Sequence, residues 1–142
     1  MTPTLLGRIQ SRLVLLATVG VVWTLIIGPF LPADGALSDV YSMAFRALAA
    51  TAILGVVLWE PLYHGLQQIR WEKDWPTSLG LVTGIPEGLL VWLLVFGDGM
   101  SGVTSTTFWL HFGTTWVLVW AAANGPLQIV LIRWRYRGGR VW

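Results

Sequence analysis

The sequence reads LVLLATVGVVWTLIIGPFL from Leu13 to Leu31. This stretch carries no charged residue, and a helix rising about 1.5 Å per residue would nearly cross a hydrocarbon core about 30 Å thick. Because it is longer than the core of a signal peptide, we interpret it as a retained membrane span. Similar apolar runs follow at 44–59, 79–96 and 108–132. The sequence therefore predicts an all-α integral membrane protein, a bundle of four transmembrane helices.

The composition agrees with this class, since 55% of the 142 residues are hydrophobic, 11% are charged and the mean hydropathy is +0.66. Four spans and short connections account for nearly the whole chain, so we predict a single membrane domain over 1–142. No room is left for a separate soluble catalytic domain. The net charge is only +2, and the arginines cluster beside the spans. There they can contact anionic lipid headgroups, so we do not expect nucleic-acid binding.

The basic residues indicate the orientation. The connections 32–43 and 97–107 contain no lysine or arginine. Beside the other ends of the runs lie Arg8, Arg12, Arg70, Lys73, Arg133, Arg135, Arg137 and Arg140. By the positive-inside rule both termini are predicted to be cytoplasmic. The preference for arginine over lysine is typical of a GC-rich bacterial genome, so we expect the bacterial cytoplasmic (inner) membrane.

The connection between the second and third runs is amphipathic. Leu62, Leu66 and Ile69 recur at helical spacing, and Trp71 and Trp75 could anchor the segment at the membrane surface. We expect either a short interfacial helix or an extension of the second span.

Small residues at every fourth position predict helix packing in two runs. The stripes are Ala47, Thr51 and Gly55 in the second run, and Gly80, Gly84 and Gly88 in the third. We expect these two stripes to pack against each other. Pro86 and Pro126 are each expected to kink their helix.

Glu87 lies at the middle of the third run, where a charged carboxylate is costly to insert. It should face the bundle and be protonated or paired. One hypothesis is a structural pair with Arg46 or His111, and the other is a proton- or cation-binding site for transport.

A metal or proton site could be formed by Glu60 and His64, which are four residues apart. Because two ligands do not define a metal site, we interpret both as residues of the cytoplasmic rim. His64 and His111 are expected at different depths, so a haem with two histidine ligands is not predicted. Cysteine is absent, which excludes disulfides and thiolate metal sites. We predict no cofactor and no metal.

Two aromatic patterns remain. Phe112, Trp116 and Trp120 form a ridge that suits helix packing or, alternatively, stacking of a quinone, carotenoid or lipid tail. The tail 133–142 is basic and aromatic, which suits lipid headgroups or a partner protein. Its candidate contact residues are Trp134, Arg135, Arg137, Arg140 and Trp142.

No nucleophile with a plausible base is recognisable in the sequence, so an enzyme is not favoured. We expect a non-catalytic accessory or assembly subunit that binds membrane lipids and a partner membrane protein or further copies of itself. The alternative is a small proton- or cation-coupled transporter or channel that uses Glu87.

Overall fold

The computed structural model describes residues 4–70, 76–97 and 100–141, apart from the side chains of Ile132 and Arg135. All the secondary-structure elements of these residues are helices. Trp71 and Trp75, which are expected to anchor the connection at the membrane surface, and Trp142, a candidate contact residue of the tail, lie outside the described residues.

The first helical rod runs continuously from Leu5 to Phe30. Its parts are α1 (Leu5–Leu15), the π-turn η1 (Leu16–Gly20), α2 (Val21–Ile27) and the 3-10 turn η2 (Gly28–Phe30). The rod begins earlier than the apolar run because the Thr4 hydroxyl accepts a hydrogen bond of 3.1 Å from the amide of Gly7 and caps the helix. Arg8 and Arg12 are consequently part of the helix.

The second rod extends from Leu37 to Ile69. It consists of α3 (Leu37–Leu54), the π-turn η3 (Gly55–Trp59) and α4 (Glu60–Ile69). The amphipathic connection therefore forms an extension of the second helix rather than a separate helix, as far as Arg70, where the described residues end. Its apolar residues point outward, with Leu62 and Leu66 each 45% exposed, whereas its polar residue Gln67 is buried.

The third rod runs from Thr77 to Phe96 and is irregular close to Pro86. It consists of α5 (Thr77–Val82) and α6 (Gly84–Phe96), with Thr83 between them. Proline has no amide hydrogen to donate to the carbonyl four residues earlier, which is that of Val82 at the end of α5. The expected irregularity of this span is present.

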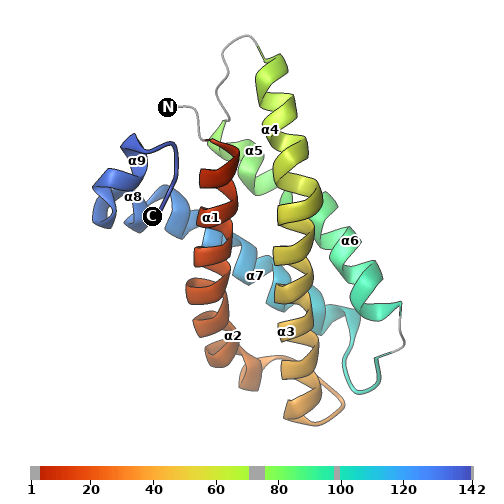
Figure 1. Cartoon of the computed structure of the whole chain (residues 1–142). Coiled ribbons are helices and arrows are strands. Elements are labelled where there is room, and N and C mark those ends of the chain that lie inside the picture. The colour runs from red at the N-terminus through yellow and green to blue at the C-terminus, as the bar shows by residue number, and fades with distance from the viewer. Residues whose placement is uncertain (1–3, 71–75, 98–99, 142) are drawn as a thin grey trace.

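The fourth helix differs from the predicted span 108–132. α7 (Ser105–Asn124) ends at Gly125, whose φ of −121° and ψ of −95° are not helical. Pro126 follows as the first residue of α8 (Pro126–Val130), and α9 (Ile132–Tyr136) comes next. The chain thus turns instead of continuing, and Figure 1 shows α8 and α9 beside the bundle, on the α1 side.

Figure 1 shows the first two rods side by side, with α5, α6 and α7 behind them. The core between them is apolar. It contains Leu31, Val40, Met43, Ala47, Val91, Val95, Val103, Phe108 and Phe112. Among the described residues, three helices are long and apolar enough to cross a membrane, namely Leu5–Phe30, Leu37–Ile69 and Thr77–Phe96.

The glycine stripe of the third rod packs against aromatic rings of α7. A Cβ atom at Gly88 would lie 2.7 Å from a ring carbon of Phe112, and one at Gly84 would lie 2.6 Å from Cδ1 of Trp116. At Gly80 the nearest side chain is that of Trp120. The predicted glycine stripe and the predicted aromatic ridge therefore pack together, because the rings occupy the space that the glycines leave open.

The small residues of the second rod have different neighbours. Gly55 faces the first rod, since a Cβ there would lie 2.8 Å from Nε of Arg12. Ala47 and Thr51 are buried and line a small cavity together with Leu16 and residues of α7. The second and third rods do pack together, and Ala47 shares the apolar core with Val91 and Val95 of α6. The glycines of the two stripes, however, have α7 and the first rod as their nearest neighbours rather than each other. Residue spacing identified the flat faces, but it does not determine which helix each face meets.

Candidate functional site: a buried charged cluster beside a cavity

Arg12 of α1 joins two glutamates from different helices. Its Nη1 and Nη2 donate hydrogen bonds of 2.6 and 3.0 Å to the two carboxylate oxygens of Glu87 in α6. Its Nε donates a bond of 2.7 Å to Glu60 in α4. One guanidinium group therefore connects three helices, with the paired geometry that favours arginine over lysine.

The cluster extends on both sides of this centre. Arg8 Nε donates a 2.6 Å bond to the other oxygen of Glu60, and its Nη1 lies 3.4 Å from the amide oxygen of Gln67. The hydroxyl of Tyr63 donates a 3.0 Å bond to Glu87. Both oxygens of Glu60 and both oxygens of Glu87 thus accept hydrogen bonds.

The four charged groups balance, with two arginines and two glutamates. The side chain of Glu87 is fully buried, and the side chains of both arginines are only 11% exposed. A buried pair of this kind is costly to break, because removing one partner leaves a charge away from water. The cluster therefore fixes α1, α4 and α6 relative to one another.

The local sequence explains how these groups meet. Arg8 and Arg12 are one helical turn apart, so they lie on the same face of α1. Glu60, Tyr63 and Gln67 share one face of α4 in the same way. Gly55 provides the space in which the Arg12 side chain crosses, since any side chain there would overlap it.

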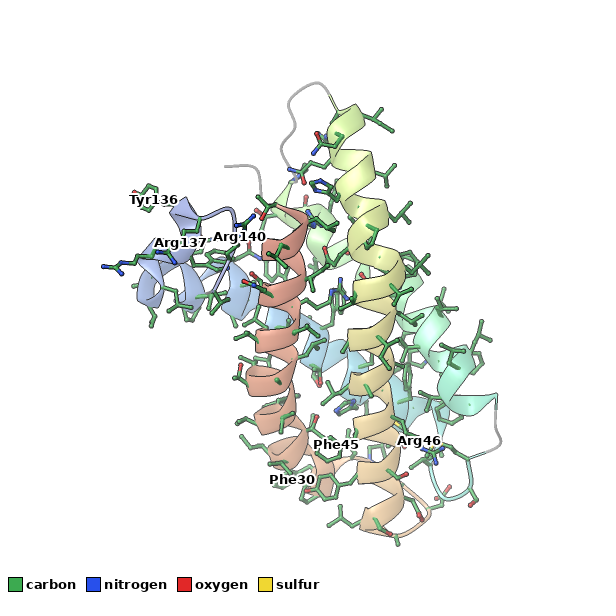
Figure 2. All side chains as sticks on the ribbon, viewed as in Figure 1. Phe30, Phe45, Arg46, Tyr136, Arg137 and Arg140 are labelled. Carbon is green, nitrogen blue, oxygen red and sulfur yellow. The ribbon has the colours of Figure 1, made fainter. Side chains whose placement is uncertain are left out.

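The two partners that the sequence favoured for Glu87 lie elsewhere. Arg46 is exposed, and Figure 2 shows it near the end of the bundle where α3 begins. His111 is 1% exposed, and its Nε2 lies 2.8 Å from the hydroxyl of Thr24. Glu87 is paired as expected, but with Arg12.

Sequence reasoning missed Arg12 because arginines beside an apolar run were assigned to orientation alone. A signal was present in their spacing. Arg8 and Arg12 lie on one helix face, and Glu60 directly follows another apolar run, so opposite charges meet wherever these faces pack together.

A cavity of about 270 Å³ lies beside the cluster. Arg12, Glu60, Tyr63 and Thr83 contribute polar groups to its wall. Much of the remaining wall is apolar, with the rings of Trp116, Trp120 and Trp134. The indole nitrogens of these tryptophans donate to Leu81 O, Thr77 O and Ser11 Oγ, respectively.

The predicted rim residues have different environments. Glu60 is 5% exposed and belongs to the charged cluster rather than to an exposed rim. His64 is partly buried, and its Nδ1 has no hydrogen-bond partner among the described residues. Across the described ranges, no three His, Asp or Glu side chains are grouped as metal ligands.

The C-terminal tail is fastened to α1. Ser11 Oγ donates a 2.8 Å bond to Gly139 O, and the amide of Val141 donates a 3.0 Å bond to Gln10. Gly138, with a φ of +63°, accepts a 2.9 Å bond from the amide of Thr4. Trp134 points toward Ser11, whereas Arg137 and Arg140 are exposed (Figure 2).

Comparison of the chain with protein-family models, with curated proteins and with solved structures found no match.

Proposed function

We propose that this chain is a multi-pass protein of the bacterial cytoplasmic membrane with both termini in the cytoplasm. The support is that large apolar side chains cover the outside while charged side chains are buried. Ile53, Val57 and Ile85 are 62% to 73% exposed, while Glu60 and Glu87 are buried. A helical protein in water exposes its charged side chains and buries its large apolar ones. A lipid bilayer instead favours apolar side chains on the outer surface and charged groups that are buried and paired. The alternation of basic residues supports the orientation.

Within that membrane, the proposed role is a non-catalytic accessory or assembly subunit of a membrane complex. The observation that carries this proposal is the complete pairing of Glu87, whose two oxygens accept bonds from Arg12 and Tyr63. A carboxylate held in this way stabilises a fixed arrangement of helices. The exposed Arg137 and Arg140 on the anchored tail provide basic groups for a partner or for lipid headgroups.

Cross-linking in intact membranes, followed by purification in mild detergent, tests this role. We expect one partner, a different membrane protein or a second copy, in a fixed ratio to the chain. Charge reversal by Arg137→Glu together with Arg140→Glu should weaken its recovery, whereas Arg46→Glu, at an exposed site far from the tail in Figure 2, should not. Recovery of the chain only as a monomer would contradict the proposal.

A second candidate is a small proton- or cation-coupled transporter. The cavity of about 270 Å³ favours it, because Arg12 and Glu60 line the cavity and would give water or an ion access to the charged cluster. In this case reconstituted vesicles should show a pH-dependent flux that Glu87→Gln abolishes without loss of folded protein. For an accessory subunit, wild-type vesicles should show no such flux, and Glu87→Gln should lower stability or complex formation instead.

A further inference from the structure

A second, smaller cavity of about 10 Å³ lies in the middle of the bundle, apart from the charged cluster. It is lined by Leu16, Ala47, Leu48, Thr51, His111, Phe112, Thr115, Trp116 and Val119. A cavity of this size is just large enough for one water molecule. Its occupancy therefore depends on the polar atoms in its wall.

The hydrogen bonds of Thr24 determine which ring nitrogen of His111 carries the hydrogen. Thr24 Oγ1 donates its single hydrogen to Gly20 O over 2.8 Å. It can therefore only accept from His111, whose Nε2 lies 2.8 Å away. In neutral His111 the hydrogen is then on Nε2, and Nδ1 carries a free lone pair that accepts hydrogen bonds.

Two buried polar atoms from residues that line this cavity have no hydrogen-bond partner in the part of the chain that the structure describes. They are Nδ1 of His111 and Oγ1 of Thr115, which belong to residues only 1% and 4% exposed. Buried polar groups without a partner are rare and costly, and ordered water commonly satisfies them. Thr51 also lines the cavity, and since its hydroxyl donates to Ala47 O, it still has a lone pair to offer.

We propose that this cavity is a binding site for one water molecule. The water donates one hydrogen to Nδ1 of His111 and accepts the hydrogen of the Thr115 hydroxyl. Its second hydrogen is directed to Thr51. Three partners are the usual number for a buried water. The water also places a hydrogen-bonding molecule close to the larger cavity, because Leu16, Thr51, Trp116 and Val119 line both.

Nitrogen NMR of the ¹⁵N-histidine-labelled protein in lipid bilayers tests the site directly. We expect His111 to be the tautomer with hydrogen on Nε2, and its Nδ1 to show magnetisation transfer from water. Thr115→Val should reduce this transfer. A histidine with hydrogen on Nδ1, or a wild-type Nδ1 without transfer from water, would overturn the proposal.

Thermal unfolding gives an independent test with opposite signs. If water is bound, Thr115→Val removes one of its partners and lowers the midpoint temperature. If the cavity is dry, the same change removes an unsatisfied hydroxyl and leaves the midpoint unchanged or raises it, which would contradict the proposal. Thr18→Val is the matched control, since Thr18 is exposed and its hydroxyl bonds to Val14 O of its own helix.

Discussion

Replacing Arg12 by methionine should destabilise the protein strongly. Arg12 donates three hydrogen bonds of 2.6 to 3.0 Å to Glu60 and Glu87. Methionine retains much of the apolar length of the side chain but none of these donors. Glu60 retains Arg8, whereas the fully buried Glu87 retains only the Tyr63 hydroxyl among the bonds described above. Breaking a buried ion pair on one side costs about 3 to 5 kcal/mol, and we expect a loss in this range.

The matching control is Arg46→Met. Arg46 is exposed and should cost no more than about 0.5 kcal/mol, the usual size of a surface effect. The double variant Arg12→Met with Glu87→Gln should recover part of the loss, because a neutral amide replaces the unpaired carboxylate. A coupling free energy of about 1 to 3 kcal/mol is expected between the two sites.

The assay is equilibrium unfolding in mixed micelles of a mild detergent and sodium dodecyl sulfate, followed by circular dichroism. The reasoning would be refuted if Arg12→Met lost no more stability than Arg46→Met. It would also be refuted if Arg46→Met lost more stability than Arg12→Met. That result is expected if Glu87 pairs with Arg46 instead of Arg12.

Three further predictions concern topology, packing and the tail. Reporter fusions after Trp75 and Trp142 should report the cytoplasm and fusions at Asp34 and Asp98 the outside, and the opposite pattern would reject the orientation. Gly84→Leu should lower the free energy of unfolding by about 1 to 3 kcal/mol in the same assay, because the new leucine side chain overlaps Trp116. Gly113→Leu is the control and should cause no such loss, since there is open space around a Cβ at Gly113. Equal losses would exclude the packing of the third rod on α7. Ser11→Ala should loosen the tail and speed tryptic cleavage after Arg137, since Ser11 bonds both Gly139 and Trp134. Unchanged cleavage would show that these two bonds do not anchor the tail.

The positions of the first three long helices could be predicted from the sequence. The apolar runs at 44–59 and 79–96 lie within long apolar helices of the structure, and the run at 13–31 does so except for its last residue, Leu31. The end of the fourth was overestimated, because apolar residues continue beyond Asn124 while Gly125 and Pro126 stop the helix. A hydropathy pattern records composition, whereas the helix end depends on the backbone at two residues.

The partners of individual side chains were harder to predict. The importance of Glu87 follows from its position alone, but its partner depends on how α1 is rotated about its axis. The glycine stripe and the aromatic ridge were both visible, yet their contact depends on the same kind of rotation. A single sequence specifies the face of each helix and leaves the pairing of faces to tertiary packing.

The separation of Arg12 from its partners has a consequence for biosynthesis. Arg12 precedes Glu60 by 48 residues and Glu87 by 75. At about 5 to 20 residues per second, the ribosome supplies Glu87 roughly 4 to 15 seconds after Arg12. Arg12 lacks Glu87 during the whole of this interval, and until Glu60 has been made it lacks both carboxylates. In the membrane location proposed above, an arginine without its carboxylates is costly to bury. Arg12 would then stay near water or beside the insertion machinery, and the first helix would reach its final depth only after the third has been made.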